Sequence, residues 1–199
     1  MKKIKNILIG TNNKGKVKEF YFLLNKKIKK FSPLQLNIKS PVETGKSFRS
    51  NSVLKAKFFF QRSKITTISD DSGLCIECLN NEPGIYSARW AKKYGGFKPA
   101  MLKIIELVKN KNKKKQNIKA KFICSLTICF DLKKIFSTTG VIHGKISNKI
   151  VGKNGFGYDS IFIPKGHSQT FGQMAKKRKM LIDHRFVAFT KLKKIINIL

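Results

Sequence analysis

Apolar positions along the first third of the chain recur with two different periods. Residues 4–9 form a short apolar run that predicts a strand, and residues 17–28 place apolar side chains at helical spacing. Ser47 is expected to cap a second helix that ends near position 61. A β-branched run at 64–69 then predicts another strand.

The rest of the chain continues this interleaving of helices and strands. Helical spacing covers residues 98–109, and two β-rich runs at 118–130 and 133–146 predict a long antiparallel pair. A short strand is expected at 159–163 and a closing helix at 180–199. The sequence shows neither an internal repeat nor a Pro- or Ser-rich linker. Interleaved helices and strands of this kind indicate an α/β fold.

The positive charge of the chain is extreme. Its 43 Lys and Arg residues outnumber 10 Asp and Glu residues, which gives a formal net charge of +33. Lysines neutralise phosphates and release counterions, so nucleic-acid binding is one interpretation. The lysines are scattered through every segment beside much Ile, Asn and Phe, which a codon bias toward A and T would also produce. Under either interpretation, the charge would attract a polyanionic substrate.

Two features of the sequence predict a cytoplasmic protein. No apolar run reaches the roughly 18 residues that span a bilayer, and the apolar run near the N-terminus is too short for a signal peptide. The four cysteines are expected to be buried thiols in a reducing compartment. Their spacing of three or five within strands turns them to opposite faces, which does not suit a zinc site.

A polar turn between the first predicted strand and helix has the spacing of a phosphate-binding loop. Gly10 and Gly15-Lys16 reproduce the pattern G-x-x-x-x-G-K, in which backbone N–H groups at a helix N-terminus hold phosphate. Val17 stands where a P-loop needs Ser or Thr, which argues against a P-loop enzyme. An ordinary βα turn has the same pattern. The residues predicted to contact a triphosphate are Thr11, Asn12, Asn13, Lys14, Gly15 and Lys16.

Adjacent carboxylates mark a second polar segment. Asp70 and Asp71 precede Ser72-Gly73 and are expected to lie between two strands. Neighbouring carboxylates repel each other unless a cation or donors offset their charge, and Mg²⁺ is the natural cation beside phosphate. One Asp is expected to bind this metal or to accept a proton from water. An Asx turn between strands is the simpler alternative.

The predicted second helix carries an amide and an ammonium on one face. Asn51 and Lys55 lie four positions apart, so their side chains are neighbours on the helix surface. A solvated helix surface explains such a pair equally well. Glu43 precedes this helix, and its position relative to the two adjacent carboxylates is not fixed by the sequence.

A glycine-rich turn at 154–159 is suited to hold a flat ring. Phe156 offers a face for base stacking, and Asp159 or the backbone nearby is expected to read a base edge. A glycine-rich hairpin with a buried Phe is the structural alternative. Lys179 and Arg185, near the start of the closing helix, are candidates to hold phosphate or a base carbonyl.

In this order, the segments resemble the inosine triphosphate pyrophosphatase family, in particular its bacterial dITP/XTP pyrophosphatase branch. The resemblance extends from Thr11 to Arg185 and rests on three motifs. Any one of them is a weak signal, but the ordered set is specific. The motifs are Asp70-Asp-Ser-Gly-Leu74, Pro83-Gly-Ile-Tyr-Ser-Ala-Arg89 and Gly155-Phe-Gly-Tyr-Asp159.

The resemblance implies one domain over residues 1–199, with a long twisted mixed sheet and helices that form two lobes around a central cleft. It implies a homodimer that hydrolyses non-canonical purine triphosphates (XTP, dITP and ITP) to the monophosphate and pyrophosphate with Mg²⁺. Asp71 matches the family's proton acceptor and metal ligand. His184-Arg185 would supply donors near the 6-keto oxygen of the base. The matched substrate positions are Thr11–Lys16, Ser72, Phe156, Gly157, Tyr158, Asp159, Lys179, His184 and Arg185.

Three positions depart from the family pattern. Val42 replaces an acidic residue, which leaves Glu43 as the nearest carboxylate to serve as the second metal ligand. Ser160 replaces a proline, and Gln173 replaces an acidic residue. An active enzyme is expected, because the assigned base and the phosphate-binding residues remain. The alternative is a basic nucleic-acid-binding protein on the same fold without catalytic activity.

Overall fold

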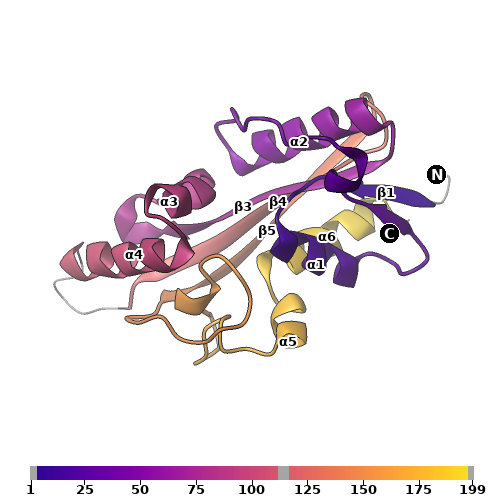
Figure 1. Cartoon of the computed structure of the whole chain (residues 1–199). Coiled ribbons are helices and arrows are strands. Elements are labelled where there is room, and N and C mark those ends of the chain that lie inside the picture. The colour runs from indigo at the N-terminus through magenta and orange to yellow at the C-terminus, as the bar shows by residue number, and fades with distance from the viewer. Residues whose placement is uncertain (1–3, 112–116, 197–199) are drawn as a thin grey trace. The chain divides into compact units, whose positions relative to one another are not determined.

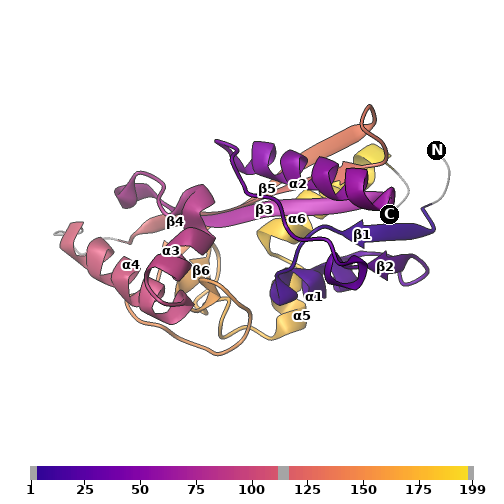
Figure 2. The ribbon, with the colours of Figure 1, turned by 45° about the horizontal axis from the view of Figure 1, so that its top comes forward.

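The computed structural model describes residues 4–111 and 117–196 and contains one mixed sheet (Figures 1 and 2). The strand order is β2-β1-β3-β4-β5-β6. Strand β1 pairs in parallel with β2 and β3, whereas β5 and β6 are antiparallel. The predicted α/β class with a mixed sheet is confirmed. The strands are β1 Asn6–Ile9, β2 Lys29–Phe31, β3 Thr67–Ile76, β4 Lys119–Cys129, β5 Ile135–Ile146 and β6 Phe162–Pro164.

Side-chain caps explain where the first two helices begin. Asn13 caps α1 by accepting a hydrogen bond from the Lys16 N–H, so this helix starts earlier than the apolar spacing predicted. Ser47 caps α2 as predicted and forms a reciprocal capping box with Ser50. The helices are α1 Lys14–Leu23, α2 Phe48–Ser63, α3 Ser87–Lys93, α4 Phe97–Lys111, α5 Lys176–Met180 and α6 His184–Ile196.

Several sequence-based boundaries were wrong. The strand predicted at 64–69 and its successor are one strand, β3, which runs straight through Asp70-Asp71-Ser72-Gly73. Helix α3 was not predicted. The closing helix is divided into α5 and α6, and the strand predicted at 159–163 is a 3₁₀ turn followed by the shorter β6. The predicted end of the closing helix lies outside the described residues.

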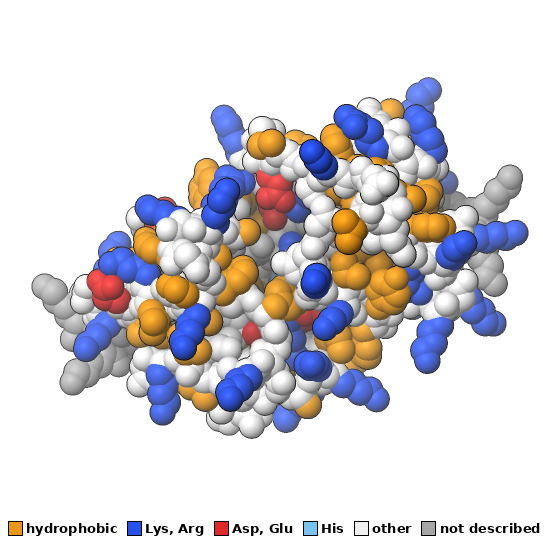
Figure 3. Space-filling view, in the orientation of Figure 1, with side chains coloured by type: hydrophobic (Ala, Val, Ile, Leu, Met, Phe, Trp, Pro, Cys, Tyr) orange, Lys and Arg blue, Asp and Glu red, His pale blue; other side chains and the backbone are white. Residues whose placement is uncertain are grey.

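Lysines and arginines are spread over the surface. On the face shown in Figure 3, their side chains occur over many elements and form no single stripe. This distribution agrees with the scatter of lysines along the sequence. Within the part of the chain that the structure describes, no helix combines the length and apolar character needed to cross a bilayer.

The chain divides into two compact units. Unit 1 comprises Met1–Asp71, Cys124–Gly140 and His184–Leu199, and unit 2 comprises Ser72–Ile123 and Val141–Asp183.

Unit 1 has helices on both faces of its strands. Helices α1 and α6 contribute Phe20 and Leu192 to a core that contains Ile68 and Leu126. Helix α2 covers the opposite face, where the Ser52 hydroxyl hydrogen-bonds the hydroxyls of two residues on β4. Because alternate residues of a strand point to opposite faces, the strands here pack against helices on both faces.

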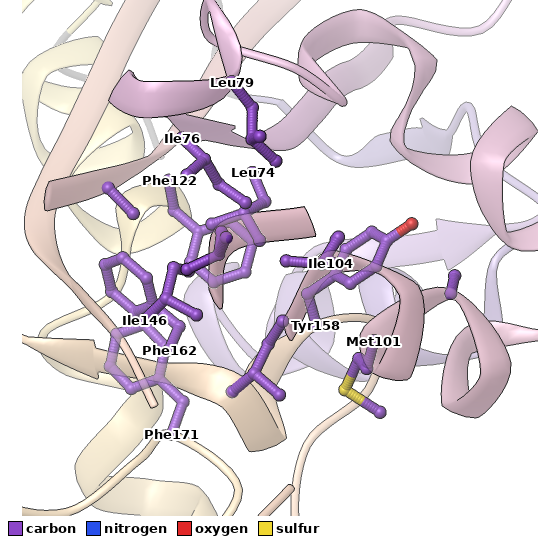
Figure 4. Close-up of a cluster of buried hydrophobic side chains, with 14 of the residues drawn as sticks. Leu74, Ile76, Leu79, Met101, Ile104, Phe122, Ile146, Tyr158, Phe162 and Phe171 are labelled. Carbon is purple, nitrogen blue, oxygen red and sulfur yellow. The ribbon is translucent and has the colours of Figure 1, made fainter. Parts of the chain in front are cut away.

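Unit 2 is built around a core that is rich in aromatic residues (Figure 4). Leu74 and Ile76 of β3 and Phe122 of β4 pack with the apolar side of α4. The Phe122 and Phe162 rings meet edge to face at 4.7 Å between centroids. Tyr158 and Ile161, at the end of the loop that connects β5 to β6, belong to this core.

Candidate functional site

The direction of β3 separates the two adjacent carboxylates. Successive residues of a strand point to opposite faces, so Asp70 and Asp71 face different helical layers of unit 1. Asp70 meets residues of α1 and α6, whereas Asp71 meets residues of α2. The sequence predicted a turn at this motif, but the continuous strand is what places the two carboxylates on opposite faces.

Asp70 lies in a buried network of charges. Its Oδ2 accepts a hydrogen bond from Arg185 Nη2 at 2.7 Å and lies 3.1 Å from Lys16 Nζ. Arg185 also donates to Glu19, and both partners are buried. Burial alone would raise the pKa of Asp70, but the positive charges of Arg185, Lys16 and Lys55 hold this pKa well below its usual range. Asp70 therefore stays ionised.

Asp71 has a different environment. Asn51 Nδ2 donates to its Oδ2 at 3.0 Å, and Lys55 Nζ lies 3.9 Å from its Oδ1. Burial raises the pKa of Asp71 and the Glu43 charge adds to this, while Lys55, Lys16 and the Asn51 hydrogen bond only partly offset the rise. A carboxylate with a raised pKa is a better proton acceptor than a carboxylate with a lowered pKa, so Asp71 suits this role better than Asp70 does.

The oxygen donors near Lys55 fit a hard divalent cation. Lys55 Nζ lies 2.5 Å from Glu43 Oε1, so the Glu43 and Asp71 carboxylates converge on the same ammonium group. The described residues contain no group of three or more potential protein ligands. This set fits Mg²⁺, which is usually held by one or two carboxylates together with substrate phosphates and waters.

The turn predicted to hold phosphate lies between β1 and α1, as expected. Asn12 Nδ2 donates to the Ser40 hydroxyl at 3.0 Å, and the Asn13 N–H donates to the Thr11 hydroxyl at 3.2 Å. Lys14 is exposed at the start of the helix. The structure thus brings Lys16 to Asp70 and leaves the preceding polar residues at a helix N-terminus, a favourable place for an anion.

In unit 2, Asp159 shapes the glycine-rich turn. Its Oδ2 accepts a hydrogen bond from the Phe156 N–H at 2.9 Å. Gly155 has a φ of +75°, and a Cβ there would lie 2.1 Å from the same carboxylate oxygen. Glycine is therefore required at this position, and the half-buried ring of Phe156 is held in a defined place.

Lys179 ties this turn to the segment before α6. Its Nζ lies 3.0 Å from Asp159 and 3.6 Å from Asp183, and it approaches the Phe156 ring at 4.8 Å from the centroid. The side chain is 3% exposed. This position packs the Lys179 ammonium group against the Phe156 ring.

The side chains of other predicted site residues also have structural partners. Tyr158 lies in the core of unit 2, and its hydroxyl donates to the Ser87 carbonyl at 2.9 Å. His184 is buried at the start of α6 in unit 1, beside Arg185. The side chain of Ser72 is half-buried. The Tyr158 hydroxyl is therefore engaged within the core of unit 2.

Sequence reasoning assigned no role to three residues that organise these groups. Glu19 binds Arg185 in unit 1, and Asp183 binds Lys179 in unit 2. The Ser87 hydroxyl accepts a hydrogen bond from the Leu74 N–H and donates to the Gly84 carbonyl. Of the three, Glu19 could have been singled out from the sequence, because it lies next to Phe20 on a helix with few acidic residues.

Comparison with known proteins extends over nearly the whole chain. Residues 7–195 match the model of the Ham1 family. The chain is 35% identical to the dITP/XTP pyrophosphatase of Zymomonas mobilis, with 94% of this chain and 89% of that protein covered. It is 37% identical to the dITP/XTP pyrophosphatase of Dictyoglomus thermophilum, with 96% and 94% covered.

Solved structures support the same grouping. The fold superposes on a HAM1 protein from Coxiella burnetii with a TM-score of 0.87 at 28% identity, covering 98% of this chain and 99% of that one. The Ham1 protein of Staphylococcus aureus gives a TM-score of 0.82 at 30% identity, covering 97% and 98%. These matches confirm the resemblance read from the ordered motifs, and the chain belongs to the Ham1 family.

Proposed function

We propose that this protein hydrolyses non-canonical purine nucleoside triphosphates such as XTP, dITP and ITP to the monophosphate and pyrophosphate, which keeps these nucleotides out of DNA and RNA. Relatives named dITP/XTP pyrophosphatase cover almost the full chain. The observation that carries the proposal is the pair Asp70 and Asp71, whose pKa values are shifted in opposite directions. Neighbouring carboxylates whose pKa values are shifted apart often have different roles in acid–base catalysis.

In the proposed mechanism, Asp71 accepts a proton from a water molecule. The water oxygen forms a bond to the α-phosphorus as the bond to the bridging oxygen breaks, and pyrophosphate leaves with that electron pair. Asn51 holds the Asp71 carboxylate in place by donating to it. Lys16 and the N–H groups of the polar turn at α1 supply positive potential for the phosphates.

Glu43 and Asp71 would hold Mg²⁺, with Glu43 in place of the acidic residue that Val42 replaces. When bound, the ion would neutralise phosphate charge and orient the triphosphate. In the structure Lys55 Nζ lies 2.5 Å from Glu43 and 3.9 Å from Asp71, and we assign its positive charge to the substrate phosphates. Its pKa is raised by the surrounding carboxylates although burial acts to lower it, so Lys55 stays protonated.

For the base, we assign stacking to Phe156. Its ring is half-buried and fixed by the hydrogen bond from its N–H to Asp159. We assign Arg185 a positioning role, because its terminal nitrogens are bonded to Glu19 and Asp70. It would act on the reaction by holding Asp70 ionised. We further propose that the protein acts in the cytoplasm as a homodimer.

The proposal is tested by pyrophosphate release from dITP, XTP, ITP, dATP and dGTP in the presence of Mg²⁺. We expect hydrolysis of the first three substrates and about 10²- to 10⁴-fold lower kcat for Asp71→Asn. Glu106→Gln removes an exposed carboxylate on α4 and serves as the matched control. Equal activity of native protein and Asp71→Asn would remove Asp71 from the mechanism. Absence of hydrolysis combined with tight DNA binding would favour the nucleic-acid alternative.

A further inference from the structure

A pocket of about 850 Å³ lies within unit 2, on the sheet face opposite the α4 core. Ala120 and Phe122 of β4 point into that core, so Lys119 and Lys121 point to the other face. Ile163 and Pro164 contribute apolar surface to the pocket. None of the residues that line it belongs to the Asp71 site, and the nearest on β3, Cys75, is four positions farther along the strand, about 13 Å away.

The register of three strands sets basic side chains opposite one another in this pocket. Hydrogen bonds from the Ile146 N–H to Ile118 and from the Phe130 N–H to Lys134 give one register for both ends of the β4–β5 pair. Counting three residues along each strand from the bond between Ile146 and Ile118 places Lys121 opposite His143.

The row continues onto β6. The Lys165 N–H donates to the His143 carbonyl at 2.8 Å, which places these two residues side by side. Lys121, His143 and Lys165 therefore form one row across three strands. By the same register, Lys119 lies opposite Lys145, whose partner on β6 is Ile163.

Like charges directly opposite each other destabilise a sheet. Among the described residues that line the pocket, four are lysines and two are histidines, whereas Glu77 is the one acidic member. Lys145 Nζ donates a hydrogen bond to a neutral partner, the Asn117 side-chain oxygen, at 3.3 Å. The pairing of Lys119 with Lys145 is therefore unfavourable for the protein alone, and a multiply charged anion that contacts the pocket lysines would offset the repulsion.

We propose that this pocket binds a small oligophosphate, either inorganic or the phosphate chain of a nucleotide. Its volume falls in the range of about 300–1,000 Å³ typical of small-molecule sites. A second copy of the chain would set lysines against lysines across a two-fold axis, so self-association through this face is disfavoured. The proposal is independent of the hydrolysis assigned to Asp71.

The test compares two triple variants by calorimetric titration with inorganic tripolyphosphate in EDTA. The pocket variant is Lys121→Gln, Lys145→Gln, Lys165→Gln. The control variant, which removes equal charge from exposed positions of unit 2 outside the pocket, is Lys98→Gln, Lys109→Gln, Lys149→Gln. We expect Kd to rise about tenfold or more in the pocket variant and less than about threefold in the control. Titration with dITP and with dATP in the Asp71→Asn background distinguishes a nucleotide from an inorganic ligand.

Several outcomes would overturn the proposal. Equal losses in both variants would mean that binding is due to the overall charge, and unchanged affinity in the pocket variant would mean that the ligand binds elsewhere. Binding of a DNA strand but not of tripolyphosphate would point to nucleic acid. A change of sedimentation in the pocket variant alone would make this face a contact between copies. The hydrolysis of dITP by both variants, expected to match the native rate, reports separately on the proposed function.

Discussion

Asp70 and Asp71 are joined by one peptide bond, yet different groups control their protonation. Arg185 and Lys16 keep the pKa of Asp70 low, whereas burial and Glu43 keep the pKa of Asp71 raised. The cause is local and geometric, because the two side chains point to opposite faces of β3.

This difference predicts the order of titration in the metal-free protein. Asp71 is expected to titrate above the value of about 3.9 of a free Asp side chain, and Asp70 well below it. On acidification, Asp71 therefore takes up its proton first, and the stability contributed by the ionised Asp70 is lost only at lower pH. Carboxyl ¹³C NMR of Asp71→Asn and the native chain would assign the two signals. A lower pKa for Asp71 than for Asp70 would contradict this account.

Removal of the Asp70 partner should destabilise unit 1. Arg185→Met removes the guanidinium that Asp70 and Glu19 share, and loss of one partner from a buried ionic network typically costs about 3–5 kcal/mol. Urea unfolding of the native and variant proteins measures this cost. The matched control is Arg178→Met, at an exposed position. Equal stability of the two variants would mean that Arg185 has no such role.

Phe156 should act on substrate binding more than on the chemical step. Loss of base stacking in Phe156→Ala removes about 1–3 kcal/mol, which predicts a KM for dITP higher by about 5- to 150-fold with a kcat that changes little. Phe156→Tyr keeps the aromatic face and should retain a KM near the native value. An unchanged KM in Phe156→Ala would exclude stacking on this ring.

Among the elements, those with strong local signals were predicted closely, including two helices and the long strands β4 and β5. The Ser47 cap and the apolar spacing of residues 98–109 predicted α2 and α4 closely, because caps and helical faces depend on nearby residues. The motif at Asp70–Gly73 was interpreted as a turn because it is polar and contains glycine. Its continuous strand depends on pairing with β1 and β4, which are distant in sequence.

The packing of α6 against β5 predicts a sensitive glycine. A Cβ at Gly140 would lie 2.1 Å from the His184 carbonyl oxygen and 2.4 Å from the Ala188 nitrogen, both backbone atoms. Gly140→Ala should therefore push α6 away from the strand and cost about 1–3 kcal/mol or more. Thermal unfolding compared with Thr139→Ala, at the exposed neighbouring position, measures this effect. Similar midpoints for the two variants would show that the helix shifts freely.

At the scale of the whole molecule, the net charge of +33 should weaken the folded state through self-repulsion. Salt screens exposed charges, with a Debye length of about 10 Å at 0.1 M. We therefore expect the thermal midpoint to rise when NaCl increases from about 20 to 300 mM. Differential scanning calorimetry checks this. A falling midpoint would mean that attractive surface pairs outweigh the repulsion.

The α/β class, the family and the residue types of the candidate site could all be predicted from the sequence, because ordered motifs and side-chain periodicity are properties of short segments. The helical spacing also predicted Asn51 and Lys55 on one helix face, and both contact Asp71. By contrast, the different partners of Asp70 and Asp71, and the burial of Lys179 and Arg185 among carboxylates, became visible in the folded chain. These properties depend on charges brought together from distant segments, and burial determines how strongly those charges act.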